Sequence, residues 1–503
     1  MFHRSLVFSL LLCLLPQKNH AAGYYNYDEN CRRAYLQFMS LHLQEGNASI
    51  IVEKKTNPGN LMADYIADYN DCILLLMNCD KGDRERVKGN FDDRIKMLEK
   101  GDPASPWYRF CLAGIYLHKA IVNIRFGEQY KAAINYRHSF SLLEENEQLF
   151  PTFEYNHVFT GLERAVIGSL PGSYRWLASV LGMSGSVKKG TEQLTTFIYA
   201  HNNEDPIYAE TVLYYVFARF YLLSEQKETW DFLNSPAFST QNNLLYTFAK
   251  VNIAIDYRRS DAALDFLHAA SANPDYSKYP IFDYQFGAAL LTKLDTNCTT
   301  YLSRYTQQAK SDIYIKDAWQ KMAFAWYANG NIGKAGNCLA HVTNNGAARL
   351  DADKQALRFA ESKTWPLKEV LQARLLIDGG YNDQAIAILK KIAPTDIKQQ
   401  ADKAEYFFRL ARAYQVLYDD GKGKDYFLLA LDNYKETIAA GKTRKEQFAA
   451  RAALQIGKMY EQIGLKKEAV DKYKECLDMP AHDFQNSIDQ QAKAGVNRIE
   501  SSN

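Results

Sequence analysis

The chain has 503 residues, of which 47% are hydrophobic and 23% are charged, and its formal net charge is +2. This length is enough for several domains or for one extended repeat array. The near-neutral balance, without a long basic run, argues against nucleic-acid binding. Gly (27) and Pro (13) are scarce, so helix breakers are few and a mostly helical protein is expected.

The first 22 residues have the composition of a secretory leader. His3 and Arg4 precede an apolar run from Leu6 to Leu15, which is followed by Pro16 and by the small residues 21–23. The run is too short to cross a membrane as a helix. We therefore expect residues 1–22 to be a signal peptide that is cleaved after Ala22 or Gly23.

A secretory leader predicts export. The expected compartment is the bacterial periplasm or cell envelope, with secretion as the alternative. Cys13 follows Leu12, where a lipid-attachment signal has a small residue, so lipidation is not expected. No later segment reaches the ~18 uninterrupted apolar residues of a membrane helix. The mature chain is therefore expected to have no transmembrane segment.

Helical hairpins repeat in the C-terminal half. In 319-WQKMAFAWYANGNIGKAGNCL-339, apolar residues recur at helical spacing, stop at residues 329–331, and then recur again. The same frame fits residues 370–394, 404–434 and 450–480. On the second helix of each unit it places a small residue, namely Ala335, Ala385, Ala430 and Ala469. This is the tetratricopeptide pattern, in which each hairpin has an apolar face that its neighbours must cover.

The repeats are irregular, and upstream they fade while the helical periodicity continues. An extra helix is expected over residues 351–364, before Trp365 and Pro366. Paired helices are expected over 209–224, 244–256, 261–270 and 284–294, and residues 24–150 also favour helices. The predicted fold is an all-α solenoid, a tetratricopeptide-like superhelix with an atypical N-terminal half. We divide it into a signal peptide (1–22), an N-terminal helical region (23–200), divergent hairpins (201–310), tetratricopeptide repeats (311–484) and a C-terminal tail (485–503).

Two further blocks point to a particular family. The stretch 157-HVFTGLERAVIGSLPGSYRWLASVLGMSGSVKKGTEQL-194 resembles the signature of the tetratricopeptide repeat protein 39 family, and 353-DKQALRFAESKTWPLKEVLQ-372 resembles a later block of that family. The resemblance implies an all-helical scaffold without catalytic residues or cofactors. Family members are intracellular proteins, so the leader is a departure and the cellular role is not carried over. The glycines from Gly182 to Gly190 lack the spacing of a phosphate loop and favour tight turns.

No catalytic or metal-binding motif stands out. The histidines occur singly, and no GxSxG, CxxC or HExxH motif is present. Cys72 and Cys79 are two helical turns apart, about 10.5 Å, which is too far for a disulfide within a straight helix. The chain is therefore predicted not to be an enzyme and to hold neither a metal nor a cofactor.

Stacked hairpins form a concave groove, so the predicted function is a scaffold for protein–protein interaction or assembly. Two alternatives stay open. One is a glycan-binding protein associated with the outer membrane, because some such proteins contain tetratricopeptide helices. The other is a carrier of lipid or another apolar ligand, suggested by the aromatic stretches FEYNHVF and LYYVFARFYLL in the middle of the chain.

A candidate binding face follows from the repeat frame. By resemblance to tetratricopeptide hairpins, the second, fifth, ninth and twelfth positions of each first helix line the groove. The ninth positions are Phe324, Arg374, Arg412 and Lys458, with Tyr327 and Phe408 at neighbouring positions. Because a guanidinium pairs bidentately with a carboxylate, this row of cations would suit an acidic or carboxylate-ended peptide.

Overall fold

The computed structural model describes residues 23–170, 176 and 178–500. The predicted signal peptide, residues 1–22, lies outside this range, as do residues 171 and 172 of the SLPG stretch. Helices form nearly all of the regular structure, and the described residues contain no β-strand, only two isolated bridges. The all-α expectation is confirmed.

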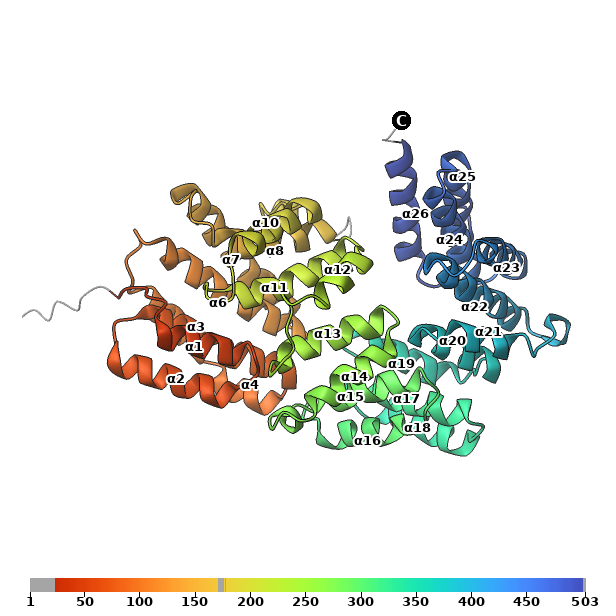
Figure 1. Cartoon of the computed structure of the whole chain (residues 1–503), viewed down its shortest axis with the longest axis horizontal. Coiled ribbons are helices and arrows are strands. Elements are labelled where there is room, and N and C mark those ends of the chain that lie inside the picture. Colours follow the sequence, from red (N-terminus) through yellow and green to blue (C-terminus); the bar gives the residue numbers. More distant parts are fainter. Residues whose placement is uncertain (1–22, 171–175, 177, 501–503) are drawn as a thin grey trace, which may run out of the picture.

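The first part of the chain forms helices that pack mainly as consecutive hairpins, with α1 on α2, α6 on α7 and α8 on α10 (Figure 1). Their bounds are α1 (Glu29–Phe38), α2 (Leu43–Thr56), α3 (Leu61–Asn78), α4 (Lys81–Val87), α5 (Asn90–Leu98), α6 (Pro106–Arg125), α7 (Gln129–Leu149), α8 (Asn156–Ser169) and α10 (Val187–Ala200).

The middle of the chain continues the hairpins, and one helix changes its winding. The α-helix α11 passes directly into a π-helical segment, η1, which then packs on α12. The elements are α11 (Tyr208–Phe217), η1 (Ala218–Leu222), α12 (Gln226–Leu233), α13 (Leu244–Asp256), α14 (Ser260–Ala270), η2 (Tyr276–Lys278), α15 (Ile281–Leu291), α16 (Cys298–Gln308), α17 (Ile315–Ala328), α18 (Ile332–Asn344) and α19 (Asp351–Ser362).

The last part is a stack of hairpins ended by one further helix. It comprises α20 (Lys368–Gly379), α21 (Asn382–Leu389), η3 (Pro394–Asp396), α22 (Gln400–Asp419), α23 (Asp425–Gly441), α24 (Phe448–Gln462), α25 (Lys466–Leu477) and α26 (Gln485–Glu500). No helix among the described residues has both the length and the apolar character needed to cross a bilayer.

Local chemistry explains where the predicted hairpin at 319–339 turns. Gly330 has φ +78°, a conformation that an L side chain strains to adopt, and it ends α17. The Asn331 side chain then accepts a hydrogen bond from the backbone N–H of Lys334 and caps α18. The helix break predicted at residues 329–331 thus consists of a glycine in the left-handed conformation followed by the N-cap of α18.

Several other expected elements are present. Segments predicted as paired helices correspond to α11 with η1, α13, α14 and α15, and the extra helix before Trp365 is α19. The four small repeat residues, Ala335, Ala385, Ala430 and Ala469, are all fully buried. Residues 485–500, which the sequence predicts to lie in a tail, form α26, and its Ile488, Ala492 and Ile499 are buried against α24 and α25.

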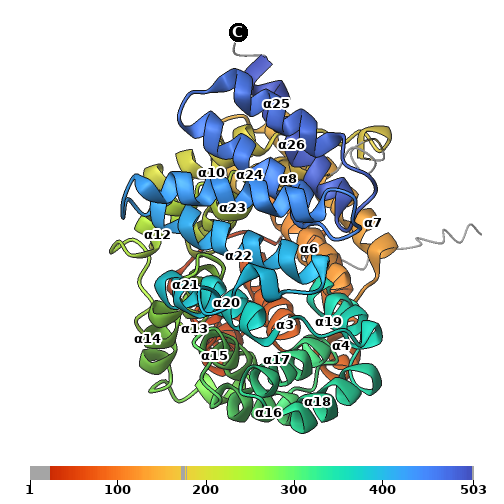
Figure 2. The ribbon, with the colours of Figure 1, turned by 90° about the vertical axis from the view of Figure 1, so that its right-hand side faces the viewer.

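Two hydrophobic cores organise the chain. One extends from Cys31 to Leu375, and the other from Val370 to Ile499, so the cores meet on α20. We refer to residues 23–345 as the N-terminal body and to residues 368–500 as the C-terminal arm. Figure 2 looks onto the C-terminal arm, which stands in front of the N-terminal body in that view.

The N-terminal body closes back on itself. The turn between α1 and α2 contacts the middle of the chain, because the backbone N–H of Leu244 donates to the carbonyl of Ser40 at 3.3 Å. The Tyr279 hydroxyl donates to the carbonyl of Leu41 at 2.9 Å. His42 pairs with Asp275 at 3.0 Å. These contacts join segments more than two hundred residues apart. At the other end of the chain, α26 packs on its sequence neighbours α24 and α25.

The glycine block at 182–190 brings α8 and α10 together. A Cβ atom on Gly185 would lie 2.3 Å from the carbonyl oxygen of Arg164, and one on Gly190 would lie 2.3 Å from that of Gly161. No larger side chain fits at either place without moving the backbone. The block therefore serves close helix packing.

Replacing Ala469 with Leu should destabilise the C-terminal arm. Ala469 is fully buried on α25, so extra methyl groups overpack the hairpin at a cost of about 1–3 kcal/mol. Thermal unfolding measures the effect. The exposed Ala340 on α18 is the matched control, and its replacement by Leu should leave the melting temperature unchanged. Equal melting temperatures for both variants would contradict the repeat frame.

Candidate functional site

The first helices of successive hairpins form one continuous inner row. Helix α13 contacts α15, α15 contacts α17, α17 contacts α20, α20 contacts α22, and α22 contacts α24. A cavity of about 450 Å³, which we call the polar cavity, opens where the N-terminal body meets the C-terminal arm. Asp317, Gln320 and Phe324 of α17 all line it, and these are the second, fifth and ninth positions of the predicted frame.

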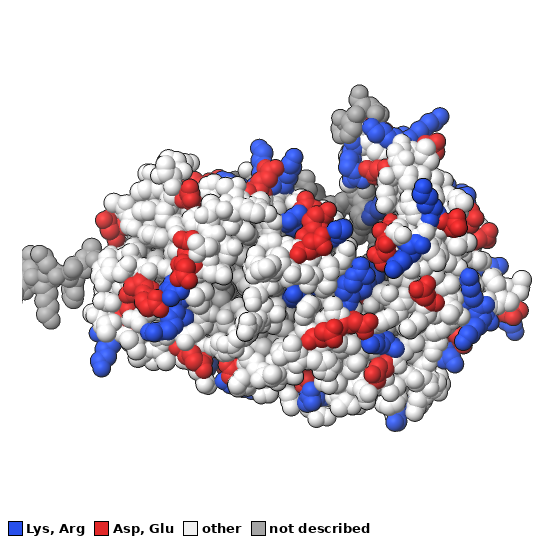
Figure 3. Space-filling model, in the orientation of Figure 1, with Lys and Arg blue, Asp and Glu red and all other residues white. Residues whose placement is uncertain are grey.

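Charges of both signs line the polar cavity. Lys321 pairs with Asp317 on the same helix, and Arg374 lies 3.9 Å from Asp378. Asp256 accepts a hydrogen bond from the Tyr221 hydroxyl at 2.6 Å, and burial raises the pKa of its carboxyl group. Figure 3 shows positive and negative side chains gathered over this junction.

Arg258 is the exception within the polar cavity. It follows α13 with φ +60°, and within the described residues it forms no ion pair with a carboxylate. Burial, reinforced by repulsion from Arg412, lowers its pKa to about 10. Asp378 and Asp419 act on it only from a distance and do not offset the burial and the repulsion. A cation that is partly removed from water without a direct ion pair is costly, so it favours the arrival of an anion.

The aromatic residues of the predicted groove are mostly packing residues. Phe324 is only 6% exposed and lies edge-on to Phe359, and Phe408 is 4% exposed between Tyr434 and Phe448. Tyr327 is half-buried; its ring stacks on Trp365 and its hydroxyl donates to the carbonyl of Pro366 at 2.9 Å. Phe324 borders the polar cavity, but little of these side chains is free for a partner.

The predicted cations, unlike the aromatic residues, keep polar contacts at the inner row. Arg412 donates to the side-chain oxygens of Gln415 at 2.8 Å and of Gln455 at 3.5 Å, and Lys458 donates to that of Gln491 at 2.9 Å. These partners are neutral amides, and neither cation forms an ion pair in the described part of the chain. Arg374 has its carboxylate neighbour on α20 and is the less available of the three.

One more cation belongs to this row and was missed in the sequence. Arg451 lies two helical turns before Lys458 on α24, at the second position of the same frame. Partial burial and repulsion from Arg409, Arg412 and Arg374 lower its pKa. Burial and repulsion from Arg412 and Arg498 likewise lower the pKa of Lys458. The frame could have identified Arg451, whereas Arg258 sits in a turn that no repeat position indicates.

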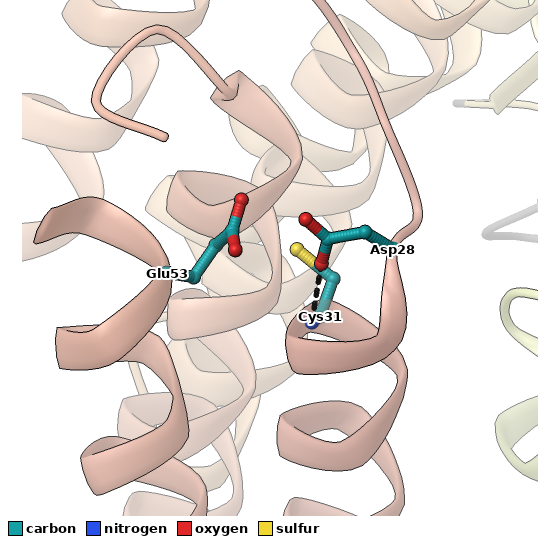
Figure 4. A group of neighbouring side chains, drawn as sticks. All are labelled: Asp28, Cys31 and Glu53. Carbon is teal, nitrogen blue, oxygen red and sulfur yellow. Dashed lines mark hydrogen bonds between the residues drawn. The ribbon is translucent and has the colours of Figure 1, made fainter. Parts of the chain in front are cut away.

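A cluster of three side chains around α1 and α2 has the residue types of a metal centre. Asp28, Cys31 and Glu53 bring two carboxylates and a thiol close together (Figure 4). Asp28 already caps α1 by accepting from the backbone N–H of Cys31 at 3.0 Å. Glu53 accepts from the side-chain amides of Asn30, Asn57 and Asn60, at 3.0, 3.2 and 2.8 Å.

These contacts do not fit a metal ion. The Glu53 oxygens are occupied by N–H donors, which a bound cation would have to displace. Burial and nearby carboxylates raise the pKa of the Cys31 thiol, which therefore stays protonated, while metals bind the thiolate. A second group, His42, Glu45 and Asp275, is likewise committed, because Asp275 pairs with His42 and with Lys278.

His118, which the sequence shows as an isolated histidine, lies in a buried ionic network. Its Nδ1 is 2.7 Å from Asp68, and its Nε2 is 3.4 Å from Glu210. Burial alone would lower its pKa, but the hydrogen bonds to Asp68 and Glu210 outweigh it and raise the pKa to about 9. Arg94 also pairs with Asp68, at 3.1 Å. His118, Asp68 and Glu210 are all buried. Their contacts therefore tie α3, α6 and α11 together and leave no open position for a substrate.

Comparisons with known proteins add little beyond the fold. No protein-family model matches the chain, and no curated protein sequence matches it. Among solved structures, yeast Tom70 is similar at 10% identity and a TM-score of 0.28, over 94% of this chain and 95% of that one. The tetratricopeptide domain of P58(IPK) is 12% identical with a TM-score of 0.21, over 87% and 98% of the two chains. Cut9, in its complex with Hcn1, is 12% identical with a TM-score of 0.23, over 93% and 95%. Such low scores carry no argument about function.

Glu163 gives a pH-dependent prediction. Burial raises its pKa from the ordinary 4.5 to about 8, more than Ser139 and Arg164 lower it. The folded protein therefore keeps a proton that the unfolded chain releases, and stability should fall as pH rises from about 4.5 to about 8. In Glu163→Gln this loss disappears, so the variant should gain roughly 1 kcal/mol per pH unit relative to the parent chain.

Urea unfolding at pH 4 and pH 8 measures this gain. The exposed Glu192 on α10, the helix that packs on α8, provides a control through Glu192→Gln. A parent chain and a Glu163→Gln variant whose stability difference is the same at both pH values would contradict the assignment.

Proposed function

We propose that this chain is a non-enzymatic scaffold that binds an acidic segment of a partner protein along the inner row of the C-terminal arm. The observation that supports this most directly is a set of cations that form no ion pair with a carboxylate among the described residues. Arg412, Arg451 and Lys458 extend along α22 and α24, and Arg258 lies at the head of the row in the polar cavity.

The electrostatics of the row favour an anionic ligand. Each of Arg258, Arg451 and Lys458 has a lowered pKa because of burial and because other cations are close. A carboxylate would relieve that repulsion and form charge-assisted hydrogen bonds, which are about twice as strong as neutral ones. Pairs such as Arg409 with Glu405 and Arg498 with Glu461 limit the net positive charge. A short acidic segment is thus a better match than a long polyanion.

The comparison with enzymes also favours a scaffold. Titratable groups with strongly shifted pKa values, such as His118 and Glu163, are packed inside helix interfaces. Catalysis needs such groups to converge on a space that a substrate can enter. The finer likeness to the tetratricopeptide repeat protein 39 family rests on the two sequence blocks at 157–194 and 353–372.

Export is part of this proposal. It rests on the apolar run at residues 6–15 and the small residues that follow it. The intact mass of the chain purified from its native source is the test. We expect a chain that begins after Ala22 or Gly23 without a lipid increment. An uncleaved N-terminus would contradict export by this leader, and a diacyl or triacyl cysteine would favour the outer-membrane alternative.

Charge reversal in the row tests the binding site. Arg412→Glu combined with Lys458→Glu should weaken binding of a fluorescent peptide rich in Glu by about tenfold or more, since a hydrogen bond to a charged group contributes roughly 1.5–3 kcal/mol. Fluorescence anisotropy at low and at moderate salt measures the affinity, and added salt should weaken the parent complex.

The control variant reverses the same number of positive charges at positions outside the inner row. Lys466 and Lys467 are exposed at the start of α25, on a second helix, so reversing both should leave the affinity unchanged. Circular dichroism confirms that each variant keeps its helices. Equal affinity for the parent and the Arg412→Glu/Lys458→Glu variant would remove the acidic-segment proposal.

A further inference from the structure

A second cavity lies among the helices of the N-terminal body. Its volume is about 510 Å³, and its walls come from α3, α6, α7, α8, α11, η1 and α13. We call it the apolar cavity. Leu213, Tyr214, Val216, Phe217 and Tyr221 of the aromatic stretch LYYVFARFYLL all line it. Ligand pockets typically have volumes of about 300–1,000 Å³ and mostly apolar walls.

The few polar groups in these walls are already engaged elsewhere. The Tyr136 hydroxyl donates to the carbonyl of Glu163 at 2.9 Å, and the Tyr214 hydroxyl donates to Glu210. The Asn252 side-chain oxygen accepts from Gln285 at 2.8 Å. Ordered water needs polar partners, which the walls of this open cavity do not offer, so the cavity favours apolar guests. The part of a ligand inside this cavity is therefore hydrocarbon.

The mouth of the cavity exposes large apolar side chains. Ile124 is 61% exposed, Phe217 is 43% exposed and Tyr221 is 42% exposed. Phe217 is the last residue of α11, and Tyr221 lies within the π-helix η1. A π-helical turn shifts the direction of the side chains that follow it, and such turns are frequent at functional sites. The chain departs from regular α-helix where it forms this mouth.

The neighbouring polar cavity holds a cation, Arg258. The Tyr221 ring lines this cavity, while its hydroxyl donates to Asp256, which lines the polar cavity, so the two cavities share a wall. Helix α13 borders both, with Asn252 and Ile253 on the apolar side and Asp256 on the polar side. Arg258, two residues beyond α13, is the cation that lacks a carboxylate partner there.

We propose that the apolar cavity binds the hydrocarbon chain of a single-chain amphiphile, and that the anionic head group of this ligand pairs with Arg258. The apolar walls favour a hydrocarbon chain, and the guanidinium of Arg258, which has no ion pair among the described residues, favours a negatively charged head group. The hydrocarbon part of this proposal does not rest on the acidic-segment site, whose cations Arg412 and Lys458 lie on the C-terminal arm. The two sites share Arg258 in the polar cavity.

The test uses a fluorescent fatty acid, 11-(dansylamino)undecanoic acid, as the probe. Its competitors are three dodecyl compounds with different head groups and octanoate, which has a shorter chain. The parent chain should bind the probe. Dodecanoate should displace it better than dodecanol, dodecanol better than dodecylamine, and octanoate should displace it least. Displacement that does not depend on chain length would overturn the cavity assignment.

Two variants locate the ligand. Ala249→Phe on α13 fills the cavity and should weaken probe binding by about tenfold or more. Ala340→Phe, the same change at an exposed position on α18, should not. Arg258→Gln should keep binding but abolish the preference for dodecanoate over dodecylamine. Equal probe affinity in the parent and Ala249→Phe chains would sink the proposal, and an unchanged preference in Arg258→Gln would refute the head-group assignment.

Two controls separate this site from other effects. If Ala249→Phe fails to fold, Phe217→Ser removes an exposed apolar side chain at the mouth and should also weaken the probe. The Lys458→Glu chain should bind the probe as the parent does, and Ala249→Phe should bind the acidic peptide as the parent does. Loss of both ligands in either chain would show that the two sites are not separate.

Discussion

Every hairpin in this chain has an apolar face that it cannot cover by itself, and this constraint determines the rest of the structure. The helices that cover this face, within a hairpin and between hairpins, must approach one another closely, which demands small residues at their contacts. Ala335, Ala385, Ala430 and Ala469 meet this demand in the second helices, and Gly185 and Gly190 meet it between α8 and α10. Once the second helices are fixed on the outside, the first helices of the later hairpins line the inside, where the polar cavity lies.

The sequence predicts what depends on neighbours along the chain. The breaker at residues 329–331, the extra helix before Trp365 and the buried alanines all follow from short-range spacing, and the structure contains them. Packing between distant segments is harder to predict. Phe324 and Phe408 occupy groove positions of the frame, yet Phe359 and Phe448, from other helices, cover them. The spacing on one helix does not show which residues of the next unit will shield it.

The same limit applies to Arg258 and to the apolar cavity. Arg258 lies in a turn and has a positive φ. Its backbone carbonyl leaves no room for a Cβ atom on Gly380. The aromatic stretch at 213–223 was visible in the sequence, but its cavity needs walls from α6, α8 and α13 as well. A linear pattern identifies the residues of one wall, and only the folded chain determines whether the walls enclose a space or pack without one.

The closure of the N-terminal body gives the two parts of the chain different mechanical properties. An open superhelix of stacked hairpins stretches like a spring, because each unit is held only by its neighbours. The bonds from Ser40, Leu41 and His42 to residues 244–279 cross-link one part of that spring. Tension applied along the chain would therefore be taken up first by the C-terminal arm, which can widen or narrow around a partner while the N-terminal body keeps its shape.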